Sequence, residues 1–232
     1  MLNSYKITVL MLLCCFLTSN INLYAQEIKV VRDFGVWMGL STKKNVLSDF
    51  NLTLEHQIRT FNNSSKLDDY LFDARLKYDI NKKFGLTGGL RYVHNTKRIE
   101  STENNIRLNL DIEYQKKIAK KTQIKYRLRA QQEFVNAYLF FFRNGQQKVT
   151  SSSIRNKLKI SFKGPKKIKL YSSIEVFRLI EVFREPYFNK FRLVIGNEIN
   201  NKIDVSIGIE KELSSNHPYS FWFLKTIYKL KR

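Results

Sequence analysis

Apolar and polar residues alternate with a period of two along most of the chain from Val46 onward. In residues 50–59 the even positions are Phe, Leu, Leu, His and Ile, whereas the odd positions are Asn, Thr, Glu, Gln and Arg. Residues 106–115 repeat the pattern with Ile, Leu, Leu, Ile and Tyr against Arg, Asn, Asp, Glu and Gln. Because successive side chains of a β-strand point to opposite faces, this period predicts strands with one apolar and one polar face. No later segment has a convincing helical period, so we expect an all-β fold.

Segments with this alternation follow one another to the end of the chain. The others cover residues 72–80, 84–92, 124–133, 154–162, 168–176, 191–199, 203–209 and 221–230, with one more around 34–40. Short turns at 81–83, 119–121, 164–167 and 200–202 alternate with longer connections at 62–67, 95–105, 136–150, 181–189 and 214–219. Outer-membrane barrels alternate in this way, with short periplasmic turns and long outer loops. We therefore expect one domain, an antiparallel up-and-down transmembrane β-barrel of about 10–12 strands.

The expected number of strands depends on where the chain ends lie. A bacterial barrel with both ends in the periplasm needs an even number of strands. We expect ten strands if the segment Phe34–Leu40 is not a full wall strand, or twelve if residues Glu27–Arg32 form another. In either case the C-terminus is expected to face the periplasm.

Several features favour a barrel in lipid over a soluble β-sandwich or a soluble periplasmic binding barrel, whose strands also alternate. Segments 50–60 and 122–134 exceed the usual strand of about 5–6 residues and match the roughly 9–11 residues that cross a bilayer at a tilt. Tyr78, Tyr92 and Tyr114 lie near the ends of apolar faces, where aromatic girdles are expected. The apolar faces carry almost no charge in mid-segment. With 43% apolar residues, the chain is too polar for a helical membrane protein.

The first 25 residues have the pattern of a secretory signal peptide. Lys6 precedes an apolar run from Ile7 to Leu17, which is shorter than the roughly 20 residues that a membrane-spanning helix needs. We expect cleavage after Ala25, which leaves residues 26–232 as an outer-membrane barrel. Both cysteines of the chain lie in the predicted signal peptide, so the mature chain has none for a disulfide or a metal site. The expected partners are outer-membrane lipids and the barrel assembly machinery.

Landmarks in a fixed order run through nearly the whole mature chain. They are Trp37 to Leu40, Leu54 to Arg59, Tyr78 to Phe84 followed by Gly89 to Tyr92, Arg127 to Glu133, Glu175 to Phe177 and Phe191 to Gly196. In order and spacing they resemble an uncharacterised family of outer-membrane β-barrels from Bacteroidota, known as domain of unknown function 2490. The resemblance implies a barrel and an outer-membrane address, and it carries no known activity.

The polar alternates face the barrel interior if the apolar ones face lipid. They are Glu55, Arg59, Asp73, Arg75, Lys77, Arg91, Arg107, Asp111, Glu113, Lys125, Arg127, Arg129, Glu133, Arg155, Lys157, Lys159, Lys169, Glu175, Arg192, Glu198, Asp204 and Glu210. In a narrow barrel, long side chains of both signs would largely fill the interior, which is a structural role. The alternative is a narrow pore that favours small anions, because Lys and Arg number 41 against 20 Asp and Glu. Arg127, Arg129, Arg155, Lys157 and Lys159, from two consecutive segments, would form its basic wall.

An enzymatic function finds little support in the sequence. Lipid-modifying barrel enzymes pair a nucleophile with a base such as His, and the chain has only His56, His94 and His217. His56 and His94 fall on the apolar alternates, without a carboxylate–histidine spacing or a metal-ligand cluster. We therefore expect no catalysis, cofactor or metal, with lipid modification as the alternative. Nucleic-acid binding is not needed to explain the charge of an exported chain with one apolar strand face.

Overall fold

The computed structural model describes residues 30–96, 102–135, 149–165, 167–181, 184–213 and 219–230. The predicted signal peptide and its cleavage after Ala25 lie outside these residues and stay predictions. Within the described ranges, no helix is long and apolar enough to cross a membrane.

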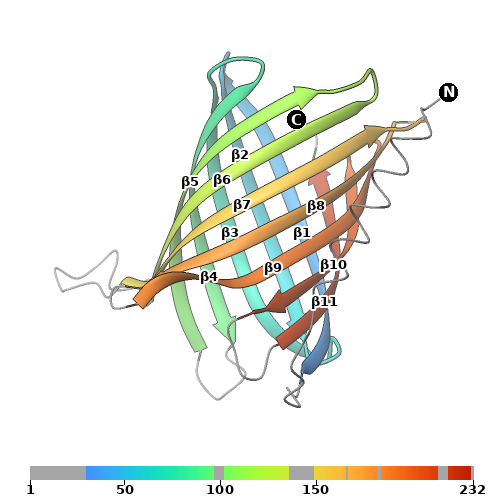
Figure 1. The fold of residues 1–232 in the computed structure, drawn as a ribbon. Helices are drawn as coiled ribbons and strands as arrows, with labels where there is room; N and C mark the ends of the chain where they lie inside the picture. The colour runs from blue at the N-terminus through green and yellow to red at the C-terminus, as the bar shows by residue number, and fades with distance from the viewer. Residues whose placement is uncertain are drawn as a thin grey trace, which may run out of the picture.

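In the described ranges, eleven strands form one closed barrel (Figure 1). The strands are β1 (Val31–Leu47), β2 (Phe50–Phe61), β3 (Lys66–Asp79), β4 (Phe84–Thr96), β5 (Thr102–Lys117), β6 (Thr122–Val135), β7 (Val149–Lys163), β8 (Ile168–Glu181), β9 (Arg184–Ile199), β10 (Ile203–Glu212) and β11 (Tyr219–Leu230). Each strand pairs with the next in sequence in antiparallel fashion, and the wall closes between β1 and β11. The predicted all-β barrel of about 10–12 strands is confirmed.

The expected even number of strands is wrong, because β1 is a full wall strand and closes the barrel in parallel with β11. The pairing runs from Val31 opposite Tyr219 to Thr42 opposite Leu230. Val31 and Arg32 are the first two residues of β1 and form no separate strand, whereas residues 27–29 lie outside the described residues. Parallel strands form a regular hydrogen-bond ladder too, so an odd number of strands can close without a free edge. The described ends of the wall therefore lie at opposite rims of the barrel.

The two rims differ in their connections. At the rim that we call the short-turn end, the strands are joined over residues 48–49, 80–83, 118–121, 164–167 and 200–202, and β11 ends there. At the opposite rim, the long-loop end, β1 begins and a four-residue turn over 62–65 joins β2 to β3. The long connection predicted over 181–189 is wrong, since β9 begins at Arg184 and pairs directly with Glu181. The turn at Ser48–Asp49 was not predicted.

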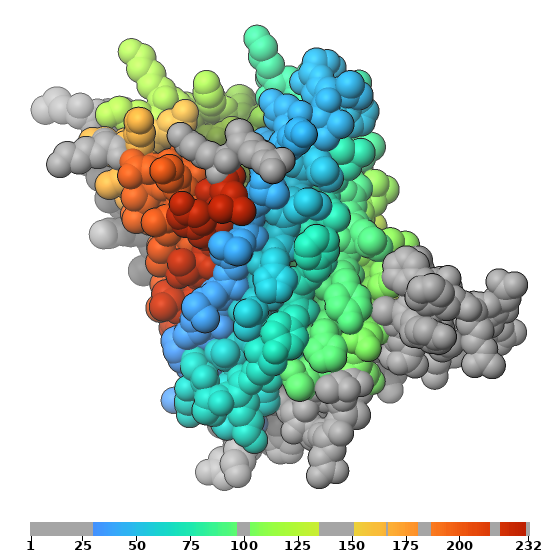
Figure 2. All heavy atoms as spheres, turned by 180° about the vertical axis from the view of Figure 1, so that it is seen from behind, coloured from blue at the N-terminus to red at the C-terminus, as the bar shows by residue number. Residues whose placement is uncertain are grey.

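The outer face of the wall is apolar. Leu110, Ile112 and Ile195 are among many large apolar side chains that the barrel exposes, and Ile195 is 66% exposed. Figure 2 shows β1 to β4, in blue to green, side by side as one continuous surface. The polar alternates of the wall strands, such as Asp73 on β3 and Asp111 on β5, are buried within the barrel. A soluble barrel has the inverse arrangement, with its apolar face inside.

The seam between β1 and β11 carries an aromatic cluster on its inner side. Trp37 stacks on Phe223 with ring centroids 3.9 Å apart, and Phe221 stacks beside them. Gly35 leaves room for the ring of Phe221, and Gly208 on β10 leaves room for that of Phe223, since a Cβ at either glycine would overlap the ring. These ring contacts join the first and last strands and so stabilise the closure.

The ion-pair layer and the cavities of the barrel interior

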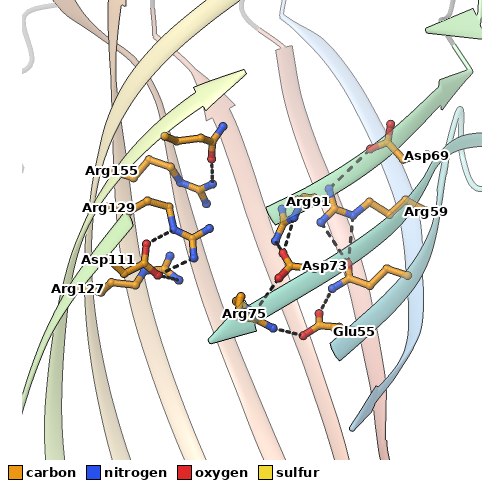
Figure 3. Close-up of polar contacts among 12 residues, drawn as sticks. Glu55, Arg59, Asp69, Asp73, Arg75, Arg91, Asp111, Arg127, Arg129 and Arg155 are labelled. Carbon is orange, nitrogen blue, oxygen red and sulfur yellow. Dashed lines mark hydrogen bonds and ion pairs between the residues drawn. The ribbon is translucent and has the colours of Figure 1, made fainter. Parts of the chain in front are cut away.

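A short and deeply buried ion pair inside the barrel joins β5 to β6. The Arg129 guanidinium donates two hydrogen bonds to Asp111, from Nε to Oδ1 at 2.6 Å and from Nη2 to Oδ2 at 2.7 Å (Figure 3). Both side chains are only 3% exposed. Arg127 lies 3.9 Å from the same carboxylate. These strands bring the groups together because Asp111 and Arg129 are direct cross-strand partners in the antiparallel register.

Glu175 on β8 is a second centre of negative charge. Its Oε1 accepts a hydrogen bond from Arg127 at 2.7 Å and lies 2.8 Å from Nη2 of Arg155, while its Oε2 lies 3.7 Å from Arg192. Arg192 also donates from Nε to Glu210 at 2.7 Å. One carboxylate, 2% exposed, is thus shared among three guanidinium groups, so positive charge exceeds negative charge around it.

A matching network extends over β2, β3 and β4. Asp73 accepts a hydrogen bond from Nε of Arg91 at 2.6 Å and lies 2.8 Å from Nε of Arg75 (Figure 3). Nη2 of Arg75 donates a hydrogen bond to Glu55 at 2.6 Å. We call the residues of the two networks the ion-pair layer: Glu55, Asp73, Arg75, Arg91, Asp111, Arg127, Arg129, Arg155, Glu175 and Arg192. Bidentate and shared guanidinium–carboxylate contacts of this kind fix side chains in place. The layer crosses the interior between the two rims.

Cavities lie on both sides of the ion-pair layer. The long-loop cavity, about 490 Å³, is lined by Trp37, Arg59, Asp68, Asp69, Arg91, Arg107, Gln131, Glu133, Ser151, Ser153, Arg155, Phe177, Leu179, Asn189, Lys190, Arg192, Glu210, Glu212, Tyr219 and Phe221. The basic cavity, about 320 Å³ and toward the short-turn end, is lined by Arg75, Glu113, Gln115, Gln123, Lys125, Arg127, Lys157, Lys159, Ser161 and Lys169. Among the described residues, none lines both cavities.

The five residues predicted as a basic wall lie on β6 and β7. Arg127 pairs across the strands with Lys157, and Arg129 pairs with Arg155. The three arginines contact carboxylates in the ion-pair layer, whereas Lys157 and Lys159 line the basic cavity without such contacts; Arg127 belongs to both. The prediction therefore grouped residues with two different surroundings.

Sequence reasoning placed Asp111, Glu175 and Lys169 on the polar face without assigning them a role. In the structure Asp111 and Glu175 bind the predicted wall arginines, and Lys169 completes the basic cavity from β8. Glu175 and Arg127 are 48 residues apart in the sequence, so no local pattern connects them. The alternation of β8 marks Glu175 as inward-facing, which is the one signal available.

His56 and His94 lie on the outer face, away from these networks. His56 is exposed, and Nδ1 of His94 lies 2.7 Å from Oδ1 of Asn104. His217 lies outside the described residues. Across the described part of the chain, no group of three or more His, Cys, Asp or Glu could hold a metal ion.

Comparison with known proteins finds structural neighbours and a family model that match this chain. The β-domain of the Bordetella autotransporter BrkA is similar in structure, with a TM-score of 0.43 and 7% sequence identity over 78% of this chain and 82% of that one. No curated protein matches the sequence. A family model described as protein of unknown function (DUF2490) matches residues 34–219. That match spans β1 to the start of β11, and the chain belongs to the DUF2490 family.

Proposed function

We propose that this protein is an outer-membrane barrel whose interior accepts small anions but is closed to free flow by the ion-pair layer. The observation that carries the proposal is the separation of the long-loop cavity from the basic cavity by buried arginine–carboxylate contacts. The function is therefore that of a filled, anion-favouring barrel without catalysis.

The apolar outer face supports the membrane location. Large apolar side chains are exposed on every strand except β2, where Leu52, Leu54 and Ile58 are half-buried, and this is far beyond the scattered apolar residues of a soluble surface. Together with the predicted signal peptide, this favours the outer membrane, with its lipids and the barrel assembly machinery as partners. Fractionation should recover the protein in outer membranes, and the protein should show heat-modifiable migration on a denaturing gel. Its intact mass should be that of a chain that begins at Gln26. Recovery as a detergent-free soluble protein would contradict the location.

The charge balance supports anion preference. Glu175 is shared by three arginines, and the basic cavity is lined by six basic side chains and one acidic side chain, Glu113. Rings of Arg and Lys in a narrow passage favour anions by direct attraction. Cations entering this interior would meet net positive charge.

Planar-bilayer recording of the refolded mature protein tests the closure. The parent barrel should show little conductance, because the Arg129–Asp111 contact and its neighbours fill the interior. The double variant Asp111→Asn with Arg129→Gln should open an anion-selective path, and the rim variant Lys82→Gln is the matched control that should behave as the parent. A large ohmic conductance of the parent would refute the closure, and cation selectivity of the opened variant would refute the anion preference.

A further inference from the structure

The basic cavity contains lysines that the ion-pair layer does not neutralise. Lys157 and Lys159 lie on β7 and Lys169 lies on β8. Among the described residues, no carboxylate oxygen lies within 4.0 Å of the Nζ of any of the three. All three lysines are half-buried, and an enclosed ammonium group with no carboxylate in contact is less stable than a paired one, so the site can take up further negative charge.

The nearby carboxylates are already occupied. Glu175, the cross-strand partner of Lys157, is contacted by three arginines. Glu113, the one acidic side chain that lines the cavity, lies 2.9 Å from Lys125 and 3.5 Å from Lys77. If one of these carboxylates moved to pair with a cavity lysine, it would therefore lose an ion pair that it already makes.

Lys159 is held in place by an aromatic ring. Its Nζ lies 3.5 Å from the ring centroid of Tyr171, whose hydroxyl donates a hydrogen bond to Asp204 at 2.5 Å. The cation–π contact orients the ammonium group without placing a carboxylate within 4.0 Å of it. The two carboxylates beyond that distance, Asp204 and Glu198, already contact Tyr171 and Lys229. The lysine is thus positioned before any ligand arrives.

The cavity's size and lining define the ligand. About 320 Å³ corresponds to roughly ten water molecules at about 30 Å³ each. Gln115, Gln123 and Ser161 add neutral hydrogen-bonding groups, and the described lining contains no aromatic or aliphatic residue. This excludes acyl chains and nucleobases, which need an apolar contact, and fits a small oxyanion that carries more than one charge.

We propose that the basic cavity is a binding site for a small multivalent oxyanion with phosphate or carboxylate groups, held by Lys157, Lys159 and Lys169. The proposal rests on the anion preference of the proposed function and not on its closure. Gln115 and Gln123 also line a cavity at the short-turn rim, so the anion enters from that rim and meets the ion-pair layer at the other side of the site.

Isothermal titration calorimetry on the refolded mature protein in neutral detergent tests the site, with pyrophosphate and citrate as probes in low-chloride buffer. The parent should bind one probe molecule saturably, and binding should fall about tenfold or more in Lys157→Gln and in Lys159→Gln. Lys157→Arg keeps the charge and should retain binding. Lys82→Gln, at the exposed short-turn rim, is the matched control and should bind as the parent does. Heat-modifiable migration verifies that each variant is folded.

The outcomes separate this site from the proposed function. Absence of saturable binding to either probe, or chloride competing at equal concentration, would overturn the multivalent-anion site. Equal losses in Lys82→Gln and Lys157→Gln would overturn the assignment to the basic cavity. If the protein binds neither probe but becomes anion-selective when the ion-pair layer is opened, the proposed function stands and the binding site proposed here is refuted.

Discussion

The contact between Arg129 and Asp111 offers the sharpest test of a dry, filled interior. Both side chains are 3% exposed and joined by two hydrogen bonds. In the described part of the barrel, Asp111 is the one ion-pair partner of Arg129, whereas Asp111 has Arg127 as a second at 3.9 Å. The two single substitutions should therefore differ in cost.

Removal of the negative charge should be the more harmful change. Asp111→Asn leaves the buried guanidinium of Arg129 without a counter-charge. Breaking a buried ion pair in this way costs about 3–5 kcal/mol of folding free energy. Arg129→Met leaves Asp111 close to Arg127 and should lie at or below the bottom of that range. The double variant removes both charges and should be less destabilised than Asp111→Asn alone, since it leaves no buried charge without its partner. The coupling should be roughly 2–3 kcal/mol.

Equilibrium unfolding in urea, measured in lipid vesicles by tryptophan fluorescence, gives the free energies of the four proteins. The chain has two tryptophans, of which Trp37 lies inside the barrel and Trp222 outside. A Trp37→Phe background leaves the lipid-facing reporter alone. The reasoning is refuted if the two substitutions are additive, or if Asp111→Asn costs less than about 1 kcal/mol, because exposed pairs in water behave in that way.

Two further perturbations test the seam and the topology. Gly208→Ala places a Cβ against an interior aromatic ring and should cost about 1–3 kcal/mol in the same unfolding assay, whereas Gly88→Ala, with open space around it, should be neutral. On intact cells, a membrane-impermeant maleimide should label Val30→Cys as readily as Ser65→Cys at the long-loop end, and should not label Lys82→Cys at the short-turn end. Labelling of all three variants would contradict the placement of the two rims on opposite sides of the membrane. Labelling of Lys82→Cys alone would contradict the orientation of the barrel.

The barrel and the direction of most side chains could be predicted from the sequence, because the alternation in strands such as β2 and β5 is nearly perfect. In residues 106–115 every even position is apolar and every odd one polar, so only one register places the apolar face outward. The structure pairs these strands in that register.

The closure could not be predicted in the same way. Residues 221–224 read Phe, Trp, Phe, Leu, so both faces of β11 are apolar and alternation does not say which points inward. Phe221 and Phe223 can point inward because Gly35 and Gly208 leave room for their rings. These glycines lie on other strands, so they are recognised as partners only once the strands are paired. The even-number rule failed for a related reason, since strand count follows from the pairing of β1 with β11 and not from any local pattern.

The charged interior combines two roles that a sequence cannot separate. Arginines in the ion-pair layer contact carboxylates on neighbouring strands, so the layer does not open by rotation of one side chain. The lysines below it have no such ties, and an anion that reaches them from the short-turn end gains attraction without displacing an ion pair. Under the closure that we propose, an anion held there has no continuous path onward. On that proposal the interior is better suited to retaining an anion than to passing one, even though both properties arise from the same excess of positive charge.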